Sequence, residues 1–149
     1  MLREKISDGT KAAMKSGDKL RLSTLRLVSA AIKNAEIEAR TSGKALTDDD
    51  LLGLLQKMIK QRRESLAIYE QHGRKEQAAQ EAGEIAVIEE FLPKQMSDAD
   101  VAAAIAAAVK EAGATSQKDM GKVMAALKAR YAGQMDFGKA SGLVKELLK

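Results

Sequence analysis

The chain has 149 residues and a formal net charge of +4, and its hydrophobic content of 45% is enough to form a buried core. It contains no cysteine, which excludes disulfides, thiolate nucleophiles and cysteine-ligated zinc. Only 3% of the residues are aromatic and a single proline is present, so the core must consist of Leu, Ile, Val, Met and Ala. This composition favours packing of helices on helices and predicts an all-α fold.

The sequence carries no sign of a membrane segment. Its first residues are charged throughout and lack the apolar stretch of a signal peptide. No apolar run approaches the roughly 18 residues that a membrane span requires. We therefore expect a cytoplasmic protein without a membrane partner.

The first part of the chain predicts four amphipathic helices that form a bundle. Apolar residues recur at steps of three and four over about residues 1–15, 19–41, 47–71 and 75–92. Asp18 and Thr47 are suited to cap the second and third helices. In the third helix we place Leu52, Leu55 and Leu66 on the side that faces the core. Short turns that contain glycine favour antiparallel packing of these helices.

Pro93 marks the strongest boundary in the sequence, because proline disfavours helix at the residue before it. Ser97 with Asp100, and Ser116 with Asp119, resemble the paired residues that start helices. Three shorter helices follow, over about residues 98–112, 116–131 and 136–148. We expect an N-terminal helical domain over residues 1–93 and a small three-helix domain over residues 94–149.

The titratable residues do not form a recognisable catalytic or metal-binding pattern. His72 is the only histidine, and it lies at a polar helix end. Gly121–Lys122 falls within a helical pattern, so it is not a phosphate-binding loop. The paired acids are expected to be solvated or to match helix dipoles: Glu36 with Glu38, Asp48 to Asp50, Glu81 with Glu84, and Glu89 with Glu90. We expect no catalytic residue, no metal and no cofactor.

A first basic cluster lies in the third helix and consists of Lys57, Lys60, Arg62 and Arg63. Arg62 falls close to the apolar stripe, so we expect it to pair with a carboxylate across the bundle. A solvated or internally paired face is the favoured interpretation of this cluster. Nucleic-acid contact is the alternative.

A second basic cluster lies in the C-terminal part, where 9 basic residues face 6 acidic ones. Glycines at 121, 133 and 138 could allow close approach of a phosphate backbone. Tyr131 and Phe137, the aromatic residues present there, fit the core pattern, so binding would depend on phosphates and shape rather than on bases. The candidate RNA-binding residues are Lys118, Lys122, Lys128, Arg130 and Lys139.

Several motifs together resemble one family. Residues 25–38 (LRLVSAAIKNAEIE), 57–65 (KMIKQRRES) and 91–96 (FLPKQM) are similar to motifs of YqeY-like proteins. Residues 119–124 (DMGKVM) and 144–148 (VKELL) resemble the tail domain that GatB/YqeY proteins share with the GatB subunit of tRNA-dependent amidotransferases. The resemblance extends over nearly the whole chain.

The resemblance implies two helical domains, with a tail like the one that helps GatB hold tRNA. It also implies an inherited label of glutamine-dependent carbon–nitrogen ligase. The chain has no counterpart of the catalytic cradle of GatB or of an amidase subunit's Ser-Ser-Lys machinery, so we expect no activity of its own.

We therefore expect a non-catalytic accessory protein that binds tRNA. The alternative is an adaptor that docks on an aminoacyl-tRNA synthetase or an amidotransferase complex through an apolar groove between its domains.

Overall fold

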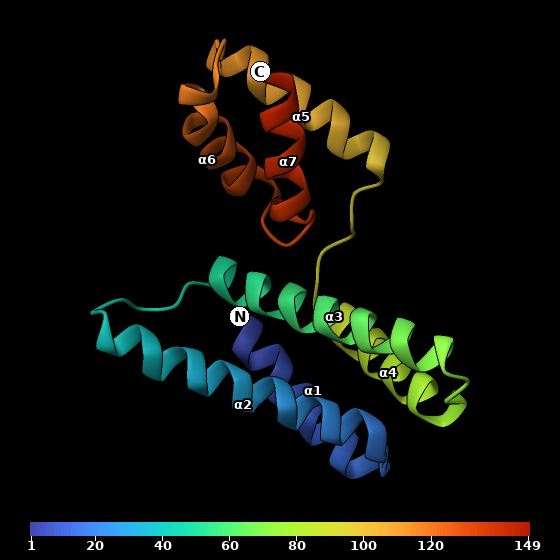
Figure 1. Ribbon diagram of the computed structural model, residues 1–149. Helices are drawn as coiled ribbons and strands as arrows, with labels where there is room; N and C mark the ends of the chain where they lie inside the picture. The colour runs from blue at the N-terminus through green and yellow to red at the C-terminus, as the bar shows by residue number, and fades with distance from the viewer. The chain divides into compact units, whose positions relative to one another are not determined.

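The computed structural model describes all residues 1–149, and its regular structure is entirely helical, which confirms the all-α prediction (Figure 1). The chain divides into two compact units, Met1–Leu92 and Pro93–Lys149, each with a hydrophobic core of its own. No helix is both long enough and apolar enough to cross a bilayer.

The N-terminal unit consists of two helical hairpins. The first hairpin joins α1 (Leu2–Ser16) to α2 (Lys19–Thr41), and the second joins α3 (Asp48–Gln71) to α4 (Lys75–Glu89) (Figure 1). Helices α3 and α4 pack along one another, and α2 packs against both α1 and α4. Helix α4 ends three residues before the expected position 92, in a turn that precedes Pro93.

Local signals set the helix ends in this unit. The Asp18 carboxylate accepts a hydrogen bond from the backbone N–H of Arg21 at 3.0 Å, which caps α2. Thr47 and Asp50 form a complete capping box, in which each side chain accepts from the other residue's backbone N–H. Gly73 ends the third helix in the left-handed conformation, with φ of +67°, a geometry that glycine adopts at little cost.

The core of the N-terminal unit contains fully buried side chains from three helices, namely Leu25, Val28, Leu51, Leu55 and Ile88. Leu55 was placed correctly, whereas Leu52 and Leu66 are only partly buried and lie at the edge of this core. The side of α3 that faces the core is therefore turned toward Leu51.

The C-terminal unit packs three helices around a second core. These are α5 (Asp98–Ala112), α6 (Met120–Tyr131) and α7 (Phe137–Leu147), and a short 3₁₀ turn, η1 (Gln117–Asp119), precedes α6. Fully buried or nearly fully buried side chains from all three helices meet at its centre: Ile105, Val123, Leu127, Ala140 and Val144.

Two details of this unit differ from the sequence-based prediction. The Ser116 side chain makes no capping hydrogen bond, and the Asp119 carboxylate instead accepts from the backbone N–H of Thr115 at 3.1 Å. Ser97 does cap α5, by accepting from the N–H of Asp100. The sixth helix consequently begins at Met120, after the 3₁₀ turn.

The segment after Pro93 is tied to the turn between α6 and α7. The backbone N–H of Met96 donates to the carbonyl of Gln134 at 2.9 Å, and the Gln95 amide donates to the carbonyl of Gly133 at 2.6 Å. These contacts hold the entry to α5 against the far end of the three-helix unit.

Candidate nucleic-acid interface

Helix α6 and the turn before it present three exposed lysines, and Asp119 of that turn is the acid next to them in the sequence. Lys118, Lys122 and Lys128 are exposed, and none of the three carries an ion pair. Helix α6 contains no Asp or Glu, and Val123 and Leu127 form its buried side. At about 100° per residue, Lys122 and Lys128 lie roughly 120° apart on the outward side of the helix. Their charges thus face solvent over a broad arc.

The three glycines considered above, Gly121, Gly133 and Gly138, have different surroundings in the structure. A Cβ at Gly121 would meet no atom within 4 Å, so this exposed helical position is open to a partner. Gly133 has φ of +76° and ends α6, and a Cβ at Gly138 would lie 3.1 Å from the Asp136 carboxylate that caps α7. The backbone conformation at Gly133 and the crowding at Gly138 therefore explain why these two positions are glycine. No contact within the chain explains the glycine at position 121.

Arg130 differs from the lysines because it is already paired. Its guanidinium lies 2.6 Å from the carboxylate of Glu111 on α5. The hydrogen bond that Arg130 donates to Glu111, together with the charge of Glu111, raises the pKa of Arg130 above its ordinary value. Both side chains are exposed, so the pair contributes little to stability. The sequence offers no signal for this pair beyond opposite charges on neighbouring helices.

Lys139 is exposed near the start of α7, next to the Asp136 carboxylate that caps this helix. Tyr131 and Phe137 are partly buried and pack against the core of the C-terminal unit, as their spacing predicted. The aromatic rings of this unit thus serve packing.

The first basic cluster divides into free and paired members. Lys57 and Lys60 are exposed and carry no ion pair. The Arg63 guanidinium lies 2.9 Å from the Glu89 carboxylate in an exposed pair. Arg62 is paired in the interior, so two of the four cations have partners within the bundle.

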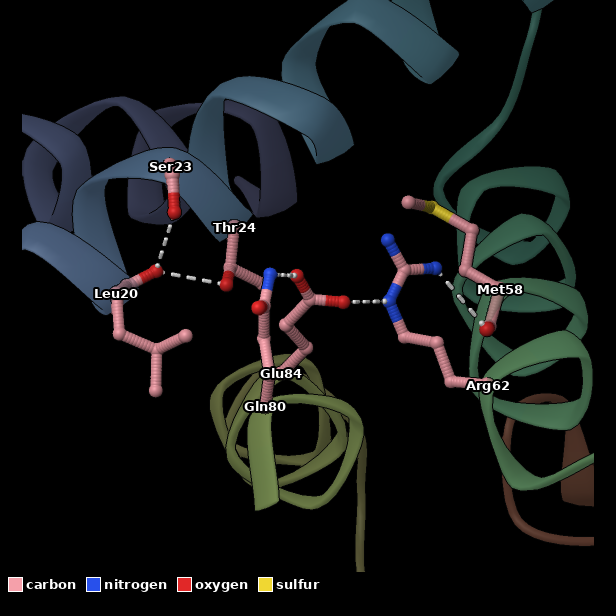
Figure 2. A network of polar contacts seen from close by, with 7 residues as sticks. All are labelled: Leu20, Ser23, Thr24, Met58, Arg62, Gln80 and Glu84. Atoms are coloured by element: carbon pink, nitrogen blue, oxygen red, sulfur yellow. Dashed lines mark hydrogen bonds and ion pairs between the residues drawn. The ribbon is translucent and has the colours of Figure 1, made fainter. Parts of the chain in front are cut away.

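Arg62 is the centre of a polar network between α3 and α4 (Figure 2). Its Nε donates to the Glu84 carboxylate at 2.9 Å, and a terminal nitrogen donates to the backbone carbonyl of Met58 at 3.2 Å. The Gln80 amide donates to the other oxygen of Glu84 at 3.4 Å. The Arg62 and Glu84 side chains are only 15% and 9% exposed, so each charge depends on the other.

Most of the acidic pairs singled out in the sequence have structural partners. Glu36 pairs with Arg3 at 2.8 Å, Glu90 pairs with Arg21, and Asp50 belongs to the capping box of α3. The hydrogen bond from the backbone of Thr47 lowers the pKa of Asp50. These carboxylates stabilise helix ends and helix contacts.

Glu81 is partly buried and differs from these paired carboxylates. One of its carboxylate oxygens is buried without a hydrogen-bond partner. Burial, and then the neighbouring charge of Glu84, raise the pKa of Glu81. No group of three or more His, Asp or Glu side chains is arranged to hold a metal ion, so Glu81 and Glu84 form an adjacent pair only.

The fold and these surfaces define an all-helical protein of two units, with three exposed lysines that make no ion pair on and beside α6. The sequence profile of the family described as Yqey-like protein matches residues 3–148. The chain belongs to this family.

Curated relatives from yeasts match part of the chain. The protein named "Altered inheritance of mitochondria protein 41, mitochondrial" from Kluyveromyces lactis is 36% identical over 86 residues, which cover 58% of this chain and 45% of the relative. The proteins of the same name from Lachancea thermotolerans and Vanderwaltozyma polyspora are 37% and 33% identical over 82 residues, covering 55% of this chain and 43% of each relative. The matched region thus spans less than half the length of these relatives.

Proposed function

We propose that this protein is a non-catalytic tRNA-binding accessory protein and that its C-terminal unit holds the RNA through phosphate contacts. The proposal is supported by the resemblance of residues 119–124 and 144–148 to the tail of GatB, which helps to hold tRNA. The proposed role is binding only and assigns no catalytic residue.

The observation that carries the proposal is the free lysines of the α6 region. Lys118, Lys122 and Lys128 are exposed and make no ion pair, and Asp119, the acid that precedes α6, offsets only part of their charge. Phosphate contacts by such side chains position a nucleic acid without reading its sequence. Arg130 is a weaker candidate because Glu111 already occupies its guanidinium.

The test is tRNA binding by the full chain with Lys118, Lys122 and Lys128 replaced together by alanine. The control replaces Lys94, Lys110 and Lys145, which are exposed lysines of the same unit outside α6, and so removes the same charge. We expect the α6 variant to lose at least about tenfold in affinity and the control to lose far less. Equal affinities for the two variants would contradict the proposal.

An adaptor role is the second candidate, and exposed leucines on α7 favour it. Leu143 and Leu147 are 46% and 58% exposed on the last helix. Exposed leucines at i and i+4 suit a partner helix. Co-purification of a synthetase or amidotransferase subunit that is lost on Leu143→Ser with Leu147→Ser, while tRNA binding persists, would favour this role.

The proposed protein has no ligase activity of its own and acts in the cytoplasm. We expect the purified chain to show neither glutaminase nor transamidation activity, which a direct assay tests. A cytoplasmic site of action stays a prediction, and the word mitochondrial belongs to the names of the yeast relatives. Cell fractionation of the source organism checks it.

A further inference from the structure

A groove with a volume of about 520 Å³ runs along the α1–α2 hairpin of the N-terminal unit (the blue helices of Figure 1). It lies outside the basic clusters considered above. Helix α1 contributes Arg3, Ser7, Thr10 and Lys11, and helix α2 contributes Ser29, Lys33 and Glu36, with Ile6 and Ile32 also lining the groove. Its volume is within the range of about 300–1,000 Å³ typical of small-molecule sites.

The spacing of these residues explains why they face one another. Residues 3, 7, 10 and 11 of α1 follow the i, i+4, i+7, i+8 pattern of one helix face, and residues 29, 33 and 36 of α2 follow i, i+4, i+7. The hairpin is antiparallel, and Arg3 Nε lies 2.8 Å from the Glu36 carboxylate. Moving along α1 therefore means moving backward along α2, which brings Ser7 opposite Lys33, and Lys11 opposite Ser29.

The charges of the groove are unbalanced at its centre. Glu36, its only acid, is neutralised by Arg3 at one end. Lys11 and Lys33 are exposed and carry no ion pair. The hydroxyls of Ser7 and Ser29 are exposed and make no hydrogen bond within the chain, whereas that of Thr10 donates to the carbonyl of Ile6 at 2.8 Å. Two ammonium groups and two hydroxyls are thus free to donate.

The floor of the groove is apolar. Ile6 and Ile32 are 2% and 7% exposed and belong to the core of the N-terminal unit. An organic ligand can pack on this floor while its charged group meets the donors at the rim. The single charge of a carboxylate would leave one of the two ammonium groups unneutralised, whereas a phosphomonoester offers three terminal acceptor oxygens and up to two negative charges.

We propose that this groove is a binding site for an organic phosphate, whose phosphoryl oxygens accept hydrogen bonds from Lys11, Lys33, Ser7 and Ser29. A small phosphomonoester presents such a group, with three terminal oxygens and up to two negative charges, whereas an RNA backbone phosphodiester presents only two terminal oxygens and one charge. The site lies entirely in the N-terminal unit and does not depend on the function proposed for α6.

The test titrates the full-length protein, labelled for amide NMR, with adenosine monophosphate, inorganic phosphate and phosphate-free adenosine. We expect saturable shifts at Ser7, Ser29 and Lys33 with the monophosphate and none with adenosine. A short RNA is titrated separately into protein that carries Lys118→Ala, Lys122→Ala and Lys128→Ala, so that binding at α6 does not contribute. Groove shifts with the monophosphate support the proposal, whereas groove shifts with RNA alone would assign the groove to a phosphodiester backbone and overturn it.

Two variants and a control make the outcome decisive. Lys11→Ala with Lys33→Ala should weaken binding at least about tenfold. Lys5→Ala with Lys15→Ala removes the same charge from exposed positions of α1 outside the groove and should change it less than about twofold. Ser29→Leu fills the groove, leaves every charge in place and should also abolish binding. Absence of groove shifts with every phosphate probe, or equal losses in the two double-lysine variants, would overturn the proposal.

Discussion

Arg62 and Glu84 show how a charged pair can be part of a helix interface. Their side chains are almost fully buried, and the hydrogen bonds from Gln80 and to the Met58 carbonyl satisfy further polar groups (Figure 2). Removing one partner leaves a buried charge without compensation, whereas replacing both with apolar residues removes the desolvation cost as well.

We therefore predict that Arg62→Leu lowers the free energy of unfolding by about 3–5 kcal/mol. The double variant Arg62→Leu with Glu84→Leu should recover most of this loss. Denaturant unfolding of the two single variants and the double variant measures the coupling between the residues. Additive losses would show that the charges do not depend on each other.

Glu81 should behave in the opposite way, because its ionised form is disfavoured in the folded protein. Burial and the charge of Glu84 raise its pKa, and one of its oxygens lacks a hydrogen-bond partner. A raised folded-state pKa favours folding at acidic pH, and this contribution is lost as pH rises through that pKa. We predict that Glu81→Gln stabilises the protein at neutral pH by roughly 0.5 kcal/mol.

The gain from Glu81→Gln should vanish below about pH 4, where the wild-type carboxyl is itself protonated. Thermal unfolding at a series of pH values checks this, with Glu76→Gln, an exposed acid at the start of the same helix, as the control. A gain that does not change with pH would argue against a perturbed carboxyl.

At this scale the sequence indicated that Arg62 pairs across the bundle but not with which acid. Its position beside the apolar stripe of α3 was enough to predict a carboxylate partner across the bundle. The choice of Glu84 depends on the register of α3 against α4, which side-chain packing decides and which no single-sequence pattern contains. The same reason explains why Glu111 was missed as the partner of Arg130.

At the scale of elements, packing explains the residues on the buried side of α6 but not the glycine on its exposed side. Val123 and Leu127 are fully buried in the core, whereas Gly121 is exposed and has no neighbour that would exclude a side chain. Glycine in an exposed helix costs about 0.5–1 kcal/mol relative to alanine. No packing contact explains this glycine, and close approach of a phosphate backbone is one explanation from outside the helix.

We predict that Gly121→Ala stabilises the protein by up to about 1 kcal/mol while weakening tRNA binding. Gly142→Ala on α7 is the matched control, because its Cβ also points into open space. It should stabilise the protein by a similar amount without affecting tRNA binding. Thermal unfolding and tRNA affinity, measured on both variants, separate the two effects. Unchanged affinity in Gly121→Ala would remove this glycine from the interface.

Helix ends were predictable where one residue decides them, and less so where packing does. Asp18, Thr47 and Gly73 mark the expected boundaries because each satisfies or ends the helix locally. The 3₁₀ turn before α6 was missed because the expected pair of Ser116 and Asp119 does not cap a helix. The Ser116 side chain makes no capping hydrogen bond, and the Asp119 carboxylate accepts from the backbone N–H of Thr115. The predicted core-facing side of α3 was one residue away from the observed one. Both Leu51 and Leu52 are apolar, and only packing decides which of them is buried.

At the scale of the whole molecule, two separate cores produce two units of different electrostatic character. Residues 1–93 carry 16 basic and 15 acidic side chains, whereas residues 94–149 carry 9 and 6. Ion pairs engage Arg3, Arg21, Arg62 and Arg63 in the N-terminal unit, and Arg130 and Lys149 in the C-terminal unit. The C-terminal unit differs by its surplus of positive charge, which favours a polyanion as its partner.

The most direct test of this account is the salt dependence of tRNA binding by the full chain. Each phosphate contact made by a lysine releases counterions, so the affinity should fall steeply as salt rises. Replacing Lys118, Lys122 and Lys128 by alanine should lower the slope of log affinity against log salt by roughly two to three. The Lys94, Lys110 and Lys145 control should keep the wild-type slope. A slope that is the same in wild type and both variants would contradict the assignment of tRNA binding to α6.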